Sequence, residues 1–259
     1  IVSGTIAGTA DVATGGGADA VTVTNVHGNT TIDGQVGADQ FDVSGAAPVG
    51  VLLTLLGGTQ PDTFAVHGWA GMLRIDGGLD SDDVTVNWTG VTESTITIQD
   101  SGDGASGVVN QDSVTINATP GVDQFNLSAG RVALVHPPPT EVVFYDGVEA
   151  LVINAFDGDD NFTIDDVTAE AIINGGPGDD YFLIGRVLTT TYSGNVPVHE
   201  LSNGNSAMLT INGGDGEDFM EVNRNRAVLN LNGDAGDDIF AINAHLEAVA
   251  NVTGGGGND

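Results

Sequence analysis

An aspartate recurs along this chain at intervals close to one or two multiples of twenty residues, and this spacing constrains the fold more than any other feature. A fixed internal period of this length is typical of stacked repeats and not of a single-copy globular domain. We therefore predict that residues 1–259 form one continuous solenoid, as a segment of a longer chain. The recurring residues are Asp19, Asp39, Asp62, Asp82, Asp123, Asp160, Asp180, Asp218, Asp238 and Asp259.

Apolar residues flank each aspartate at fixed distances. Those two and four positions after it alternate with other residues, and this period of two predicts a strand with one buried face. Another apolar residue stands seven positions before it, so each repeat is predicted to contain a strand, a glycine-rich turn, a second strand and a return segment. Examples are Phe41, Phe64, Phe125, Phe162 and Phe182 two positions after the aspartate, and Ile32, Leu55, Ile75, Ile116, Ile153, Ile173, Ile211 and Leu231 seven positions before it.

A unit of two strands cannot bury its apolar face alone, so the repeats are expected to stack. Coils stacked in register would pair each strand with its equivalents at about 4.8 Å, and the crossover rule favours a right-handed coil. The predicted fold is therefore all-β, a right-handed parallel β-helix or β-roll-like solenoid with about 20 residues per coil.

Three of the intervals are close to forty residues, which predicts longer or degenerate coils near residues 90–118, 124–150 and 185–210. In the first interval, Ala105 is expected at the aspartate position. In the second, Val132 and Leu134 are expected in the first strand, and Val143 and Tyr145 in the second. The third interval is compatible with a coil and equally with a looped-out excursion.

The charge of the chain limits its partners. Acidic residues outnumber basic ones 36 to 5, the net charge is −31, and the sequence contains neither Lys nor Cys. Nucleic acid is not an expected partner because its binding depends on cationic side chains. No apolar run approaches the roughly 18 residues that span a bilayer, so no membrane insertion is predicted. Like charges at this density destabilise a compact chain unless cations bind.

The turn before the aspartate carries a glycine-rich motif, with its best copies at GGPGDD (175–180), GGDGED (213–218), GDAGDD (233–238) and GGGGND (254–259). Looser copies are GQVGAD (34–39) and AFDGDD (155–160). Glycine at the first, second and fourth positions permits positive φ angles that turn carbonyl oxygens inward. The motif resembles the GGxGxD repeat of the RTX, or repeats-in-toxin, family. That resemblance implies Ca²⁺ ions shared by the turns of successive coils and held by carbonyl oxygens and the sixth-position Asp.

The resemblance implies a specific set of metal ligands. These are Asp39, Asp62, Asp82, Asp160, Asp180, Asp218, Asp238, Asp259, Gly175, Gly178, Gly213, Gly216, Gly233, Gly236, Gly254 and Gly257. Ions are expected between the pairs Asp19/Asp39, Asp39/Asp62, Asp62/Asp82, Asp160/Asp180, Asp218/Asp238 and Asp238/Asp259. The chain departs from the family because the motif occurs once per coil instead of twice, and because some of its glycines are replaced, by Gln60, Asp80 and Ala155 among others.

The expected function is that of a calcium-stabilised structural module in a bacterial extracellular or cell-surface protein, such as an adhesin, sheath, filament or surface layer. Its expected partners are calcium and, by self-association, the ends of other copies or neighbouring repeats of the same protein. The acidic residues outside the period, Asp100, Asp103, Asp165 and Asp166, are expected to be surface charges.

Two alternatives belong to other functional classes. A carbohydrate- or ligand-binding module would use residues 90–118 and 185–210, with Trp69 and Trp88 as candidate sugar-stacking platforms. A polysaccharide-acting enzyme would need basic side chains or histidines beside carboxylates in a groove. We predict no enzymatic activity, because the five Arg and five His are scattered along the sequence and match no catalytic spacing.

Overall fold

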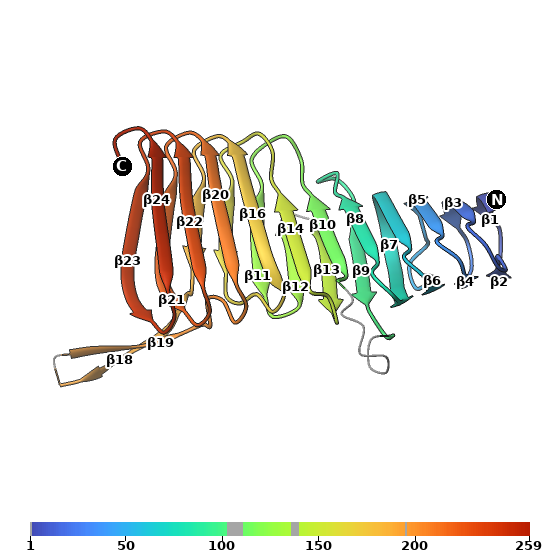
Figure 1. Cartoon of the computed structure of the whole chain (residues 1–259), viewed down its shortest axis with the longest axis horizontal. Helices are drawn as coiled ribbons and strands as arrows, with labels where there is room; N and C mark the ends of the chain where they lie inside the picture. The colour runs from blue at the N-terminus through green and yellow to red at the C-terminus, as the bar shows by residue number, and fades with distance from the viewer. Residues whose placement is uncertain (1, 103–110, 136–139, 195) are drawn as a thin grey trace. The chain divides into compact units, whose positions relative to one another are not determined.

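Strands and no helix occur in the part of the chain that the computed structural model describes, which comprises residues 2–102, 111–135, 140–194 and 196–259. The chain divides into two compact units, each described separately below: unit 1 comprises residues 1–118 and 136–152, and unit 2 comprises residues 119–135 and 153–259. The strands of each unit pair mostly in parallel, with equivalent residues about 20 positions apart (Figure 1). The predicted parallel β-solenoid is confirmed. Its right-handed coiling and its continuity as one domain over residues 1–259 stay predictions.

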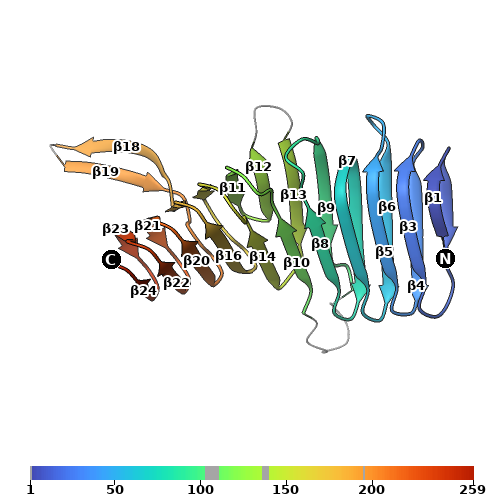
Figure 2. The same ribbon diagram turned by 90° about the horizontal axis from the view of Figure 1, so that it is seen from above.

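Unit 1 stacks its strands in two rows, which we name by their place around the glycine-rich turn (Figure 2). The post-turn row contains β1 (Val2–Ile6), β3 (Ala20–Val26), β5 (Gln40–Ala46), the first part of β7 (Thr63–Leu79), β8 (Asp83–Asn87) and β10 (Ser113–Asn117). The pre-turn row contains β2 (Ala10–Ala13), β4 (Thr30–Val36), β6 (Leu52–Thr59), the last part of β7, β9 (Ser94–Gln99) and β13 (Thr140–Asp146).

Unit 2 has the same two rows. Its pre-turn row contains β16 (Glu170–Pro177), β20 (Leu209–Asp215), β22 (Leu229–Ala235) and β24 (Ala250–Gly256). Its post-turn row contains β11 (Gln124–Ser128), β15 (Asn161–Ile164), β17 (Tyr181–Ile184), β21 (Phe219–Asn225) and β23 (Ile239–Leu246). The remaining strands are β12 (Arg131–Val135), β18 (Val187–Ser193), β19 (Val196–Leu201) and β14 (Ala150–Asn154), which contains the boundary between the units.

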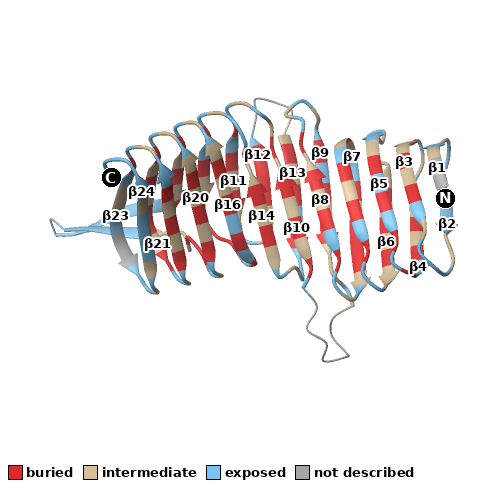
Figure 3. Cartoon of the chain, turned by 45° about the horizontal axis from the view of Figure 1, so that its top comes forward, coloured by how far each residue is buried: buried red, intermediate tan, exposed pale blue. Residues whose placement is uncertain are grey.

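The core of each unit consists of columns of equivalent apolar side chains. Phe125, Phe162 and Phe182 pair in register in unit 2, with ring centroids 4.3 and 4.8 Å apart. Phe41 and Phe64 stack in the same way in unit 1, at 4.7 Å. Buried positions alternate with exposed or partly exposed ones along the strands, as the period of two predicts (Figure 3). The stacking of identical columns therefore supplies the burial that one repeat lacks.

The register corrects the prediction for residues 90–118. β10 pairs with β8 so that Ile116 lies beside Val86, which places Ile116 in the post-turn row and not in the pre-turn row. Asp112 consequently takes the aspartate position of the next coil, 30 residues after Asp82. Ala105, which was predicted for this position, lies outside the described residues.

Residues 124–150 do not form the predicted degenerate coil. Val132 and Leu134 lie in β12, which runs antiparallel to β11 within unit 2. Val143 and Tyr145 lie in β13, which pairs in parallel with β9 in the pre-turn row of unit 1, although the post-turn strand was predicted for them. The antiparallel turn of the chain at β11 and β12 explains the error, because both strand directions give the same alternation of apolar residues.

Residues 185–210 form an excursion and not a coil. β18 and β19 pair with each other as an antiparallel two-stranded ribbon, and almost all of their residues are exposed. The solenoid continues beneath this insertion, because Tyr181 of β17 pairs directly with Phe219 of β21. None of the described residues forms a helix long and apolar enough to cross a membrane.

We expect the replacement of Phe162 by Ala to lower the free energy of unfolding by about 3–5 kcal/mol, because it removes the middle ring of a fully buried stack and leaves a cavity. Replacement of Phe144, whose residue is 41% exposed, by Ala serves as the control and should cost far less. Urea denaturation measures both, and equal losses would contradict the stacked core.

Candidate metal centre

The recurring aspartates lie inside the turns and not on their surface. Each unit has one column, and the interior members are no more than 4% exposed. The column of unit 1 contains Asp19, Asp39, Asp62, Asp82 and Asp112, and that of unit 2 contains Asp123, Asp160, Asp180, Asp218, Asp238 and Asp259. Asp19 is partly exposed and Asp259 is exposed. Burial of so many carboxyl groups is unusual, because ionised groups lose hydration when they leave water.

One repeated hydrogen bond connects the members of each column. The backbone N–H of every aspartate except the last in each column donates to Oδ1 of the aspartate in the next coil, for example from Asp62 to Asp82 at 2.7 Å and from Asp180 to Asp218 at 2.8 Å. The N–H of Asp112, the last aspartate of the unit 1 column, donates to Oε2 of Glu149 instead. All six pairs predicted from the sequence are neighbours in this arrangement. Three further pairs, which sequence spacing missed, are Asp82/Asp112, Asp123/Asp160 and Asp180/Asp218.

The second carboxylate oxygen is buried and faces other oxygen atoms. A Cβ added to Gly57 would overlap both Oδ2 of Asp62 and the carbonyl oxygen of Gly77 in the next coil, so these two acceptors lie close together. Asp180 has the same relation to the Gly213 carbonyl. Among the described residues, no hydrogen-bond donor reaches Oδ2 of Asp39, Asp62, Asp82, Asp160, Asp180, Asp218 or Asp238. Buried acceptors without a donor are costly and call for a proton or a cation.

Burial raises the pKa of these carboxyl groups, because the charged form loses its hydration. The pKa rises to about 7 for Asp62 and Asp160, and to about 8 for Asp82 and Asp180. The pKa of Asp218 rises to about 6 for the same reason. In each case the hydrogen bond from the preceding aspartate opposes the rise, and the charge of a neighbouring carboxylate adds to it. Without a metal, the carboxyl groups of Asp62, Asp82, Asp160 and Asp180 are therefore largely protonated below neutral pH.

The glycines of the motif have two different roles. Those at the second and fourth positions have positive φ, as predicted, for example +107° at Gly176 and +142° at Gly178. The first glycine, such as Gly175, does not have a positive φ, which corrects the prediction for that position. At Gly175 a side chain is excluded because a Cβ would overlap the Asp180 carboxylate and the carbonyl of the next coil, although Ala155 occupies the first position in the turn of Asp160. The first glycine thus makes room for the carboxylate.

Imperfect copies of the motif keep the same backbone. Positive φ occurs at Gln35, Phe156 and Asp234 in the second position, and at Gln60 and Asp80 in the fourth. The stacked coils therefore impose the turn conformation even where the residue is not glycine, at a cost of about 1–2 kcal/mol per residue. The turn geometry extends further along the chain than the letters of the motif indicate.

An asparagine ladder fixes the turns of unit 2 immediately before the first glycine. Asn174 donates to Asn154, Asn212 to Asn174, and Asn232 to Asn212, at 2.7–2.8 Å. Side-chain amides can form such a chain because each carries both a donor and an acceptor. The ladder holds the first glycines of successive turns in register, and with them the carbonyl oxygens that face Oδ2.

The prediction of surface charges is wrong for one of the acidic residues outside the column. Asp166 is buried and accepts hydrogen bonds from Ser206 and Asn203, so it is not a surface charge. Asp165 forms an ion pair with Arg186 at 2.7 Å. Both interactions lie where the ribbon of β18 and β19 leaves unit 2. Asp100 is partly buried, and Asp103 lies outside the described residues.

The donor set of the column suits a hard cation. Its candidate ligands are carboxylate Oδ2 atoms and glycine carbonyl oxygens, and Ca²⁺ prefers such oxygens. In the described parts of the chain, no three Asp, Glu or His side chains converge on one point as a metal cluster. Carbonyl oxygens and water would thus have to supply most ligands of each ion.

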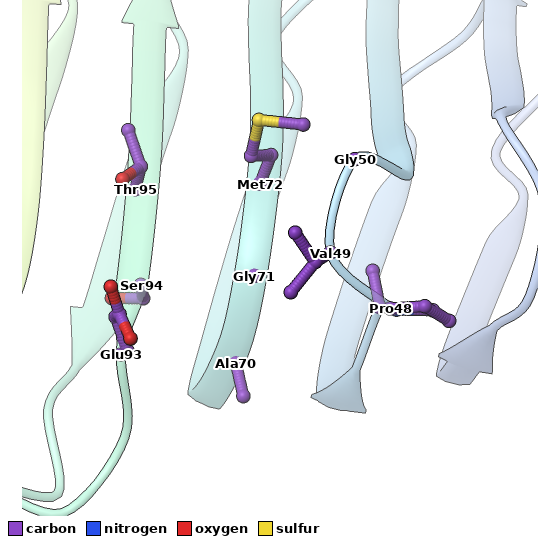
Figure 4. Close-up of a pocket in the computed structure, with 10 residues that line it drawn as sticks. Pro48, Val49, Gly50, Ala70, Gly71, Met72, Glu93, Ser94 and Thr95 are labelled. Carbon is purple, nitrogen blue, oxygen red and sulfur yellow. The ribbon is translucent and has the colours of Figure 1, made fainter. Parts of the chain in front are cut away.

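Two surface hollows border the segments predicted for ligand binding, although most residues of the first lie outside residues 90–118. In unit 1, a groove of about 350 Å³ is lined by Pro48, Val49, Met72, Glu93 and Ser94, among others (Figure 4). In unit 2, a cleft of about 570 Å³ lies between the ribbon and the β21 and β23 strands, and is lined by Val187, Pro197, Val198, His199, Leu201, Asn223 and Asn243. Trp69 and Trp88 are buried and cannot act as sugar-stacking platforms. The ligand-binding alternative stays a prediction.

Comparison of the chain with known protein families, with curated protein sequences and with solved structures finds no match.

We expect the metal-free chain to lose stability as the pH rises from about 4 to about 8. The folded state binds more protons than the unfolded state in this window, because burial raises the carboxyl pKa values from the ordinary 3.8 to about 6–8. Unfolding then releases protons, and the free energy of unfolding falls with pH. Thermal melts in chelator across this range measure the effect, and a melting temperature that rises toward pH 8 would contradict it.

We expect the replacement of Gln60 by Gly to raise the free energy of unfolding by about 0.5–1 kcal/mol. Gln60 is exposed and has a φ of +79°, so the change relieves backbone strain without loss of packing. The replacement of Gly58 by Ala in the same turn should act in the opposite direction, because its φ is +111° and the new Cβ would overlap the Gln35 carbonyl. Urea denaturation compares the two variants. A loss of stability in Gln60→Gly would contradict the strained turn.

Proposed function

We propose that this chain is a calcium-stabilised structural module of a bacterial extracellular or cell-surface protein, such as an adhesin, sheath, filament or surface layer. The observation that carries the proposal is the column of buried Oδ2 atoms without a donor among the described residues. Those of Asp39, Asp62, Asp180, Asp218 and Asp238 also lie near a glycine carbonyl of the next coil. The resemblance of the turns to the RTX motif supports calcium as the cation.

A cation bound between the aspartates of successive coils would remove the main electrostatic repulsion in the fold. The oxygen atoms of the buried carboxylate and of the facing carbonyl both carry negative charge and repel each other. A cation between them would attract both oxygens. The proposed ligands in unit 2 are the Oδ2 atoms of Asp160, Asp180, Asp218 and Asp238, with carbonyl oxygens of the turns. Calcium supplies charge neutralisation and cross-linking of successive coils, and not catalysis.

The calcium affinity expected of these sites indicates the environment in which the module would work. Sites with one carboxylate oxygen each are weak, and the calcium of extracellular environments, in the millimolar range, would fill them. The net charge of −31 opposes compaction before cations bind. Folding coupled to calcium binding would let the chain become rigid only outside the cell. A rigid stack of coils suits a spacer.

The proposal predicts that calcium raises the melting temperature and that Asp180→Asn reduces this rise. In chelator at pH 8, the Asp180→Asn variant should be as stable as the wild type or more stable, because its amide carries no charge and can donate to the Gly213 carbonyl. In calcium the order should reverse. The loss of one calcium site should lower the free energy of unfolding by about 2.7 kcal/mol at a calcium concentration of 100 times the dissociation constant.

Asp157→Asn is the matched control, because it removes one charge from an exposed position in the neighbouring turn of the same unit. It should respond to calcium as the wild type does. Circular dichroism melts and calorimetric titration with Ca²⁺ and Mg²⁺ provide the measurement. The proposal fails if calcium changes neither the melt nor the heat of titration, or if Asp180→Asn keeps the full calcium response.

A further inference from the structure

The ribbon formed by β18 and β19 differs in charge and burial from the rest of the chain. It extends away from the strands of unit 2 in both views (Figures 1 and 2). Residues 187–201 contain one Glu, one His and no other ionisable charge, in a chain whose net charge is −31. Large apolar side chains are nevertheless exposed along it, at 42–72%: Val187, Leu188, Tyr192, Val196 and Val198.

The base of the ribbon is fixed to unit 2, so the ribbon is not a loose loop. Arg186 pairs with Asp165 at 2.7 Å, and its backbone exchanges hydrogen bonds with Ser202. Asp166 accepts from the backbone and the hydroxyl of Ser206 just beyond the ribbon. These contacts hold the base of the ribbon on unit 2. In the described part of the chain, the two strands beyond the base pair only with each other, and an isolated two-stranded ribbon is only marginally stable in water. A further strand would complete it.

The free edge of β18 has the properties of a pairing edge. Among the described residues, β18 pairs only with β19. Its sequence, Val187–Ser193, has high β-propensity and contains no charge, Pro or Gly, the devices that usually protect an edge. β19 carries both Pro197 and Glu200. The exposed edge of β18 is therefore the one suited to pairing.

The backbone groups that face outward can be inferred from Pro197. Tyr192 lies opposite Pro197, which has no N–H to donate, so this pair is of the non-hydrogen-bonded type. By alternation, Thr190 and Tyr192 direct their N–H and C=O groups away from β19, and this alternation ends at the register shift between Val187 and Thr189. These two alternate positions of β18 thus each offer both a donor and an acceptor to a new strand.

The edge is complementary to itself. An antiparallel pair of two β18 strands with its two-fold axis at Thr190 places Leu188 opposite Tyr192 and Thr189 opposite Thr191. Aromatic–aliphatic and Thr–Thr cross-strand pairs are both stabilising. A two-fold interface buries the same patch of each partner. We propose that the ribbon is a dimerisation arm, in which the β18 edges of two copies of this chain join into a four-stranded antiparallel sheet.

Electrostatics favours this segment over others for self-association. Two copies of a chain with a charge of −31 repel each other wherever acidic surfaces meet. The nearly uncharged arm lets backbone edges meet while the acidic coils stay apart. The cleft beside the ribbon is lined by four residues of β19 but by only the first residue of β18, so the β18 edge does not depend on it. This inference is independent of the proposed calcium sites.

Sedimentation velocity over a concentration series, in calcium and about 0.15 M salt, tests the proposal. We expect the wild type to reach twice the monomer mass as its concentration increases, and added salt to favour the dimer by screening repulsion. Thr190→Pro removes the central outward N–H, and Thr190→Asp places like charges opposite each other. Both variants should stay monomeric at concentrations at which the wild type is dimeric.

Two controls separate edge pairing from other effects. His199→Pro makes the equivalent change on the opposite edge of the ribbon and should leave the dimer intact. An equimolar mixture of Thr190→Asp and Thr190→Lys should regain the dimer through an opposite-charge pair, which a merely misfolded arm could not do. The proposal is overturned if the wild type stays monomeric throughout, if both Thr190 variants still dimerise, or if the charge-swapped mixture does not.

Discussion

The hydrogen bond from one aspartate N–H to the next aspartate carboxylate is the interaction on which the rest of the structure depends. It holds Oδ1 in place, and this leaves Oδ2 pointing at the first glycine of its own turn and at a carbonyl of the next coil. The same bond sets the register of the turns, and the pre-turn and post-turn rows inherit that register. The buried aspartates therefore align the coils of each stack, and their burial is also the largest electrostatic destabilisation of that stack.

That cost explains why proton and cation are alternatives for the column. Each unsatisfied Oδ2 can be neutralised by a proton, as the raised pKa values of Asp62, Asp82 and Asp180 indicate. A hard cation would accomplish the same and would attract the carbonyl oxygens as well. Coils with ordinary apolar turns would need neither. The fold therefore contains a built-in dependence on its solvent, which suits a module whose rigidity has to arise in one environment and not in another.

Much of the fold could be predicted from the sequence, because the buried residues recur at regular intervals. Phe125, Phe162 and Phe182 stack as their spacing predicts, and all six predicted aspartate pairs are neighbours. The failures have one cause, since a period of two identifies a buried strand but neither its row nor its direction. Ile116 and Val143 were assigned to the wrong rows for this reason. Asp112 could have been found, because residues 112–117 (DSVTIN) repeat the pattern of residues 82–87 (DDVTVN).

The ribbon of β18 and β19 shows the converse limit. Its residues are almost all exposed, so no burial pattern marks them, and the alternation that revealed the coils is missing. Val187–Ser193 differs from the rest of this acidic chain because it carries no charge. This feature becomes informative only with the structure, in which no second strand among the described residues pairs with β18. Sequence periodicity thus reports the packing of the solenoid, and it stops where the chain leaves the stacked coils. In this chain that point is the 38-residue interval between Asp180 and Asp218, two aspartates that are direct neighbours in the column.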